Sequence, residues 1–158
     1  MVSVVLGAVI VALLIGSGLF MSRGAHLELK GRIQKERTGA LDATHAVLVL
    51  DFRVTNPSDL PFVVKSVDVF LIDSRGQEVK GQYVAEVDAR PLFQAVPALG
   101  DKFNPTLVMR EKIVSKQTVD RMVATAFDLP EAELEARRGV VLKIQDLDGP
   151  VSVLRDKK

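Results

Sequence analysis

AVLVLDFRVTNPSDLPFVVKSVDVFLID, residues 46–73, decides the fold class of this 158-residue chain. One face of its first ten residues is apolar without a break, and it consists of Ala46, Leu48, Leu50, Phe52 and Val54. The opposite face begins with Val47 and Val49 and ends with polar residues. Asn-Pro-Ser-Asp at 56–59 then predicts a turn, because proline fixes φ and short polar side chains bond to nearby backbone. Residues 62–73 alternate again, so the stretch predicts two strands joined by a turn.

The sequence on both sides of this pair also favours short strands. Residues 26–35 alternate with period 2, residues 38–44 suit a connection, and a turn at Ser74-Arg75-Gly76 leads into a weaker strand. Further extended segments are expected at residues 77–87, 106–114, 140–147 and 150–154. Residues 118–129 fit both helical and strand spacing, and one short helix is expected after Pro130. Many short strands with frequent turns predict an all-β sandwich or barrel.

The longest irregular connection spans residues 88–104. Asp88 could cap a helical turn that runs to Gln94, and Pro97, Gly100 and Pro105 interrupt the rest. Long connections are often functional or mobile. Its aromatic rings can form a lid over the core or a ligand site, and the lid is the favoured interpretation. The residues chosen as a candidate partner-binding site are Arg90, Phe93 and Phe103.

The N-terminal segment predicts a membrane anchor. Residues 2–21 contain no charge, and about 20 helical residues span the roughly 30 Å of a bilayer's hydrocarbon core. A buried core helix rarely runs this long without a polar face. A cleaved signal peptide has a shorter apolar region behind a basic start, which this segment lacks. We therefore expect three parts: an uncleaved transmembrane anchor at 1–22, a sandwich domain at 23–154 and a frayed tail at 155–158.

The side of the membrane stays open at this stage. Five cations follow the apolar segment, and the positive-inside rule would leave the large domain in the cytoplasm. Long domains, however, translocate largely regardless of nearby charge. The basic run at 30–37 is either a solvated strand face or a contact for anionic headgroups. The anchor contains three small residues one turn apart, Ala8, Ala12 and Gly16. They form a candidate helix-packing stripe, which makes self-association possible.

Composition argues against several kinds of chemistry. The chain has no Cys, which excludes disulfides and thiolate sites, and its formal net charge of +1 with no Trp argues against a nucleic-acid platform. Two histidines, His26 and His45, are expected at the surface, outside any catalytic motif. Asp-Leu-Asp-Gly at 146–149 resembles the start of a calcium loop but lacks the closing Glu, so a plain turn is expected. We expect no enzyme activity, no metal and no cofactor.

Two stretches resemble known immunoglobulin-like domains. DFRVTNPSDLPFVVKSVDVFL (51–71), followed by Gly76 and Gly81, is similar to the water-stress, late-embryogenesis type of immunoglobulin-like domain. VDRMVATAFDLPE (119–131) resembles the strand and Phe-x-x-Pro ending of bacterial extracytoplasmic immunoglobulin-like domains. The resemblance covers about a third of the chain, favours a strand at 118–129 and implies an antiparallel immunoglobulin-like β-sandwich. These families are mostly non-enzymatic and supply no catalytic residues.

Together these features predict a non-enzymatic, membrane-anchored binding or scaffold protein of the bacterial envelope. We expect a single pass through the inner membrane by residues 2–21 and a periplasmic domain, with the cytoplasmic face as the alternative. The expected partners are membrane lipid and other envelope or membrane proteins, and not nucleic acid. The other function considered is a small accessory subunit of a larger membrane protein complex.

Overall fold

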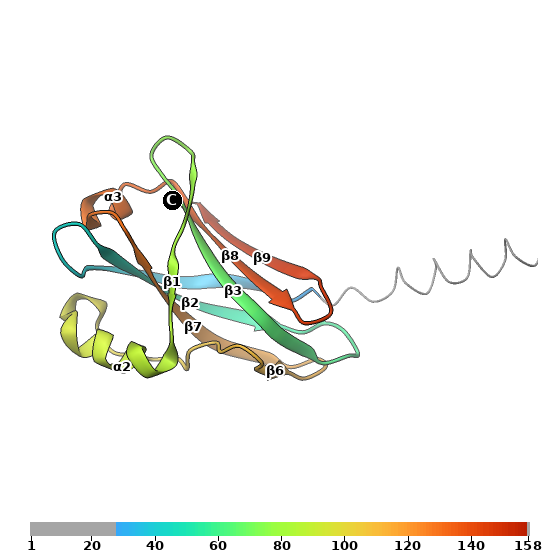
Figure 1. Cartoon of the computed structure of the whole chain (residues 1–158). Coiled ribbons are helices and arrows are strands. Elements are labelled where there is room, and N and C mark those ends of the chain that lie inside the picture. The colour runs from blue at the N-terminus through green and yellow to red at the C-terminus, as the bar shows by residue number, and fades with distance from the viewer. Residues whose placement is uncertain (1–27, 158) are drawn as a thin grey trace, which may run out of the picture.

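Two antiparallel β-sheets pack face to face in the computed structural model, which describes residues 28–157 (Figure 1). The first sheet has the order β1-β2-β7-β5 and contains β1 (Lys30–Ala40), β2 (Ala46–Thr55), β7 (Thr118–Phe127) and β5 (Gln82–Val84). The second has the order β4-β3-β8-β9, with β6 beside β3, and contains β3 (Phe62–Ile72), β4 (Glu78–Lys80), β6 (Lys112–Ile113), β8 (Gly139–Asp146) and β9 (Val151–Lys157). The predicted all-β sandwich is therefore confirmed.

The predicted anchor at residues 1–22 lies outside the described residues. The same holds for its stripe of Ala8, Ala12 and Gly16, and for His26. Within residues 28–157 no helix is both long and apolar enough to cross a membrane.

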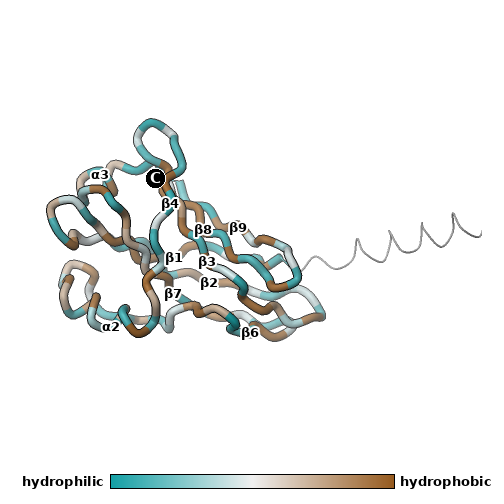
Figure 2. Tube along the Cα trace, in the orientation of Figure 1, coloured by the Kyte–Doolittle hydropathy of each residue, from teal (hydrophilic) through white to brown (hydrophobic). Residues whose placement is uncertain are grey.

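The main core lies between the sheets and follows from the alternation of the long strands. Apolar and polar residues alternate along these strands in Figure 2, because successive side chains of a strand point to opposite faces. The largest fully buried side chains in this core include Phe52, Phe62, Phe127, Leu48, Leu50 and Leu71. Burying a side chain of this size contributes about 1.5–3 kcal/mol. The apolar residues of the alternating pattern thus form the inner faces of both sheets.

The strands with the clearest pattern lie where the sequence predicts them. β2 has the predicted bounds, and β7 pairs with it along its whole length, from Ala46 opposite Phe127 to Thr55 opposite Thr118. Residues 118–127 are therefore a strand, as the resemblance favours. β3 carries a register shift between Val64 and Ser66. This bulge puts Val64 in the core and leaves Val63 half-buried, so the alternation of β3 changes phase at the bulge.

One predicted strand divides between the two sheets. Residues 77–87 form β4 in the second sheet and β5 in the first, and the chain crosses at Gly81. A Cβ on Gly81 would lie 2.1 Å from Thr125 Cγ2 and 2.6 Å from Phe127 Cζ. Only glycine allows the backbone to cross this close to β7. The single continuous strand expected from the sequence is therefore wrong.

The helices and the C-terminal tail also differ from the prediction. The described residues hold two α-helices, α2 (Glu86–Ala95) and α3 (Glu131–Glu135), and one short 3-10 helix, η1 (Pro97–Leu99). α2 contains the helical turn expected at 88–94, but it begins before Asp88 and its N-cap is Ala85, so the expected cap is wrong. α3 follows Pro130 as predicted. Residues 155–157 are not frayed, because β9 pairs with β8 as far as Lys157 opposite Gly139. β1 continues to Ala40, beyond its expected end, because it pairs with β2 up to Ala46.

Candidate interaction surface

A lid segment, residues 86–104, covers part of the outer face of the first sheet. It comprises α2, η1 and the extended residues that follow them. Val96 and Leu99 of this segment pack in a second apolar cluster with residues from β2 and β7, namely Val47, Val49, Met122 and Ala124. Val47 and Val49 belong to the face of β2 that points away from the main core. The apolar start of that face in the sequence is therefore explained by the lid segment.

A buried ion pair joins the lid segment to the sheet. Arg37 of β1 and Asp51 of β2 lie 2.7 Å apart (Nη2 to Oδ2), and both side chains are almost fully buried. Arg37 Nη1 also donates to the carbonyl oxygens of Leu99 (2.6 Å) and Asp101 (2.7 Å). Asn104 Nδ2 donates to Asp51 Oδ1 at 2.8 Å. Arg37 thus binds the lid segment before Phe103, and Asp51 binds it after Phe103.

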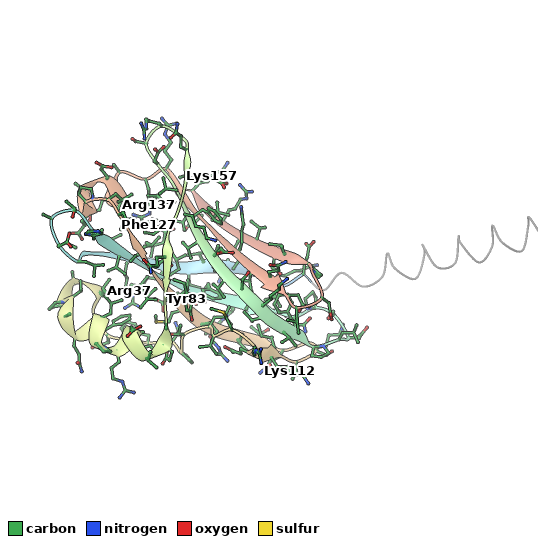
Figure 3. All side chains as sticks on the ribbon, viewed as in Figure 1. Arg37, Tyr83, Lys112, Phe127, Arg137 and Lys157 are labelled. Carbon is green, nitrogen blue, oxygen red and sulfur yellow. The ribbon has the colours of Figure 1, made fainter. Side chains whose placement is uncertain are left out.

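The two aromatic rings of the lid segment lie against this ion pair. The Arg37 guanidinium is 5.1 Å from the ring centre of Phe93 and 5.5 Å from that of Phe103, next to α2 in Figure 3. Lys35 Nζ lies 5.4 Å from the Phe103 ring. At these distances a cation is attracted to the face of an aromatic ring. Phe103 is nevertheless 65% exposed, so a ring held by two cations still presents most of its surface to solvent.

An open depression of about 430 Å³ lies between α2 and the residues that follow η1. Its lining residues are Arg90, Phe93, Gln94, Gly100, Asp101 and Lys102. Lys102 Nζ lies 2.7 Å from Glu86 Oε1 and so ties the end of the lid segment to the start of α2. The Lys102 ammonium lowers the pKa of Glu86, which keeps that carboxylate ionised. The depression therefore has one aromatic wall and charges of both signs.

The structure places two of the three residues predicted from the sequence in the depression. Arg90 and Phe93 line the depression, and Phe103 follows its last lining residue in the chain. Phe93 packs against the apolar cluster on the outer face of the first sheet, whereas Phe103 is mostly exposed, so the two rings do not form the lid over the main core that the sequence favours. Whether these residues bind a partner stays a prediction.

Sequence reasoning missed the residues that hold the lid segment. Arg37 was expected within a basic run on a solvated strand face or at lipid headgroups, and this is wrong, because its side chain is only 7% exposed. The bulge between Ile33 and Lys35 shifts the alternation of inward and outward side chains along β1 before the chain reaches Arg37. The available signal was on β2, where Val47 and Val49 precede Asp51 on one face. Apolar residues followed by an acid on the outer face of a strand predict a segment that covers the apolar residues and a cation that pairs with the acid.

The described histidine lies at the surface, as predicted. The His45 side chain is 46% exposed, and its Nδ1 lies 2.8 Å from Asp42 Oδ2. Hydrogen bonding to Asp42 raises the pKa of His45 above its ordinary value, and Asp128 adds a smaller effect. The pKa of Asp42 is lowered, first by the Thr44 backbone N–H that its carboxylate accepts and then by His45. This cluster is a local turn of the β1–β2 connection.

The acidic turn at 146–149 is engaged with backbone. Asp146 Oδ1 accepts from the N–H of Asp148 at 2.8 Å, and Oδ2 accepts from the N–H of Val63 at 2.8 Å. Gly149 has a φ of 116°, in a region that favours glycine. Across residues 28–157, no group of three or more His, Asp and Glu side chains could hold a metal ion. The segment forms the β8–β9 turn.

Comparison with solved structures finds one fold that is similar to this chain. It is the crystal structure of an uncharacterized β-sandwich protein from Clostridium difficile 630. The match has 14% sequence identity and a TM-score of 0.44, and it covers 82% of this chain and 86% of that protein. No family model matches the chain, and no curated protein matches it.

Proposed function

We propose that this chain is a non-enzymatic, membrane-anchored immunoglobulin-like β-sandwich protein of the bacterial envelope that binds a protein partner through the lid segment. One observation carries the binding role: Phe103 is 65% exposed although the buried Arg37–Asp51 pair holds the segment on both sides of it. Aromatic and arginine side chains are enriched among the residues that dominate protein interfaces. A ring that is already ordered loses little conformational entropy on binding.

The anchoring role is supported by the sequence before the sandwich. Residues 2–21 contain no charge and are long enough, as a helix, to span a bilayer. Seven residues later the chain enters the sandwich at Glu28. We assign the sandwich to the periplasmic side, because long domains translocate largely regardless of the cations near an anchor.

Site-specific photo-crosslinking in cells tests the binding role. A photoreactive benzoyl-phenylalanine in place of Phe103 in the full chain is compared with the same residue in place of Val153. Val153 is an exposed apolar residue of β9, 43% accessible, and belongs to the other sheet. We expect a discrete protein adduct from position 103 and none of that size from position 153. Equal adducts at both positions, or none at 103, would contradict a partner site on the lid segment.

The second candidate is a small accessory subunit of a larger membrane complex. This candidate has the same anchor as the first, but here the anchor helix packs against transmembrane helices of other subunits. The favouring feature is the spacing of Ala8, Ala12 and Gly16, since small residues four apart let two helices approach closely in lipid. We expect Ala12→Leu to reduce the size of the native complex on a blue native gel under this function only. Under the first function, the same gel shows no change.

A further inference from the structure

Three loops meet at the end of the sandwich where the described chain begins, and we name them the proximal loops: residues 56–61, 114–117 and 147–150. β1 starts at Lys30 opposite Thr55, directly before the first of these loops. The N–H of Leu29 donates to Ser152 Oγ at 2.7 Å, close to the third loop. Figure 1 shows the chain entering the sandwich at this end. The described chain therefore begins at the end of the sandwich that carries the proximal loops.

Each proximal loop exposes one large apolar side chain. Leu60 is 54% exposed, Val114 is 48% exposed and Leu147 is 58% exposed. The three belong to three different connections, so their shared position comes from the fold and not from neighbouring sequence. Single exposed apolar residues are common at protein surfaces. Three at one end, one on each loop, form a pattern that fits an apolar contact.

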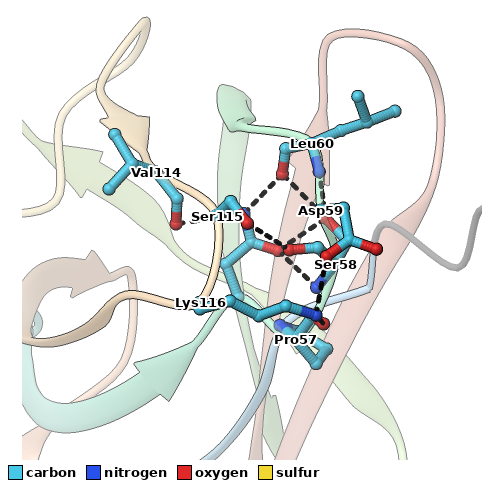
Figure 4. A network of polar contacts seen from close by, with 8 residues as sticks. Pro57, Ser58, Asp59, Leu60, Val114, Ser115 and Lys116 are labelled. Carbon is cyan, nitrogen blue, oxygen red and sulfur yellow. Dashed lines mark hydrogen bonds and ion pairs between the residues drawn. The ribbon is translucent and has the colours of Figure 1, made fainter.

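A network of hydrogen bonds holds the first two proximal loops together (Figure 4). The fully buried Asn56 donates from Nδ2 to the carbonyl oxygens of Leu60 (2.8 Å) and Ile113 (3.1 Å). Ser115 Oγ donates to the carbonyl oxygen of Ser58 at 2.8 Å. Lys116 Nζ donates to the Pro57 carbonyl at 2.6 Å and lies 3.1 Å from Asp59 Oδ1. The loops that carry Leu60 and Val114 are thus one rigid unit.

The third proximal loop is tied to the same unit through β3. Asp146 accepts from the N–H of Val63, as described above. The N–H of Leu147 donates to the Val63 carbonyl oxygen at 2.9 Å. Val63 itself pairs with Lys112, next to the second loop. All three apolar side chains are therefore presented by preordered backbone, which lowers the entropic cost of a contact.

The number of residues between 2–21 and the sandwich limits how far the proximal loops can lie from the bilayer. Six residues, 22–27, separate Met21 from Glu28, and even a fully extended six-residue segment spans only about 20 Å. If residues 2–21 span a bilayer, its surface lies within that distance of this end. The proximal loops carry one cation, Lys116, and two exposed acids, Asp59 and Asp148, so their orientation is inferred from this length and from the exposed apolar side chains. The short connection therefore orients the proximal loops towards the membrane.

We propose that the proximal loops rest on the bilayer that holds residues 2–21, with Leu60, Val114 and Leu147 inserted among the lipid headgroups. This inference rests on the membrane anchoring proposed above and adds an orientation to it. The lid segment then lies on a side of the sandwich, away from the lipid surface, where a partner can reach Phe103. Contact of exposed apolar side chains with the headgroup boundary is favourable in proportion to the apolar area buried.

The full chain, which has no native cysteine, allows a direct test in vesicles of phosphatidylethanolamine and phosphatidylglycerol. Leu60→Cys and Leu147→Cys are each labelled with the fluorophore bimane. Leu41→Cys is the matched control, because Leu41 is 41% exposed and lies in the β1–β2 connection at the opposite end. We expect brominated lipid to quench about half of the emission at positions 60 and 147, and iodide in the water to quench position 41.

Two further measurements separate this inference from the anchor itself. The chain is first floated with the vesicles on a density gradient. If it floats but iodide quenches positions 60 and 147 as strongly as position 41, the orientation is wrong and the anchor stands. If it does not float, the anchor and the orientation both fall. Leu60→Ser together with Val114→Ser is expected to reduce bromine quenching at position 147, whereas Leu41→Ser is expected to leave it unchanged.

Discussion

At the scale of single residues, Arg37 is a buried cation that binds both the sheet and the lid segment. A buried charge is costly unless it is paired and hydrogen-bonded, and breaking such a pair leaves its partner buried and alone. Arg37 satisfies its two terminal nitrogens with Asp51 and with two carbonyl oxygens, while its Nε has no hydrogen-bond partner. The pair therefore positions the lid segment. Replacing Arg37 measures how much of the stability of the folded protein depends on this pair.

We predict that Arg37→Ala destabilises the protein by about 3–5 kcal/mol, because Asp51 stays buried without a cation. The measurement is urea denaturation followed by circular dichroism. Arg53→Ala is the control, since Arg53 and Asp120 form an exposed pair at 2.7 Å, worth about 0–1 kcal/mol. Equal losses for the two variants would show that Arg37 does not act as a buried partner.

The His45 pair predicts a pH dependence. Asp42 raises the pKa of His45 above its ordinary value of 6.5. A group with a raised folded pKa stabilises the folded state when protonated, so this contribution is complete below pH 6.5 and is lost as pH rises through the folded value. Proton NMR titration of the ring should show that Asp42→Asn lowers the His45 pKa. Asp128→Asn should lower it less, and the reverse order would contradict the contacts described.

At the scale of elements, the lid segment is a small layer added to the outer face of a sandwich. Its contact with β1 is close: a Cβ on Gly39 would lie 2.4 Å from Val96 Cγ1. Valine has little freedom to move aside, because it is branched at Cβ. The lid segment must therefore shift if position 39 gains a side chain.

We predict that Gly39→Ala loosens the lid segment and leaves the main core intact. Hydrogen exchange measured by mass spectrometry should become faster for the amides of α2 and η1 and stay unchanged for β3 and β8. Ala40→Ser is the control, because Ala40 is exposed on the same strand. Faster exchange across both sheets would instead mean that the substitution unfolds the domain globally.

The sequence predicts the elements whose pattern is local and fails where a distant contact decides. β2 has one face that is apolar throughout, and its bounds follow from that alternation. α2 contains Pro91 and lacks a capping side chain, so the local sequence predicts only a helical turn at 88–94 within its ten residues. Its position depends on Arg37, more than fifty residues earlier in the chain. The division of β4 and β5 likewise depends on how close Gly81 comes to β7.

At the scale of the whole molecule, we propose a different task for each region. In this proposal the apolar N-terminal segment anchors the chain, the proximal loops face the lipid, and the lid segment presents Phe103 to a partner. The sandwich holds these regions in fixed relation, because the proximal loops and the lid segment are both bonded to its strands. This arrangement places the partner beside the domain and not between the domain and the membrane.

The central claim, an anchored sandwich on the periplasmic side, is tested most directly by labelling one introduced cysteine in intact cells. Ser74→Cys places the only thiol of the chain in the exposed β3–β4 turn. Cells expressing the full chain are treated with a membrane-impermeant maleimide, before and after lysis. We predict labelling without lysis, in the membrane fraction. Labelling only after lysis would put the sandwich on the cytoplasmic face and contradict the envelope function.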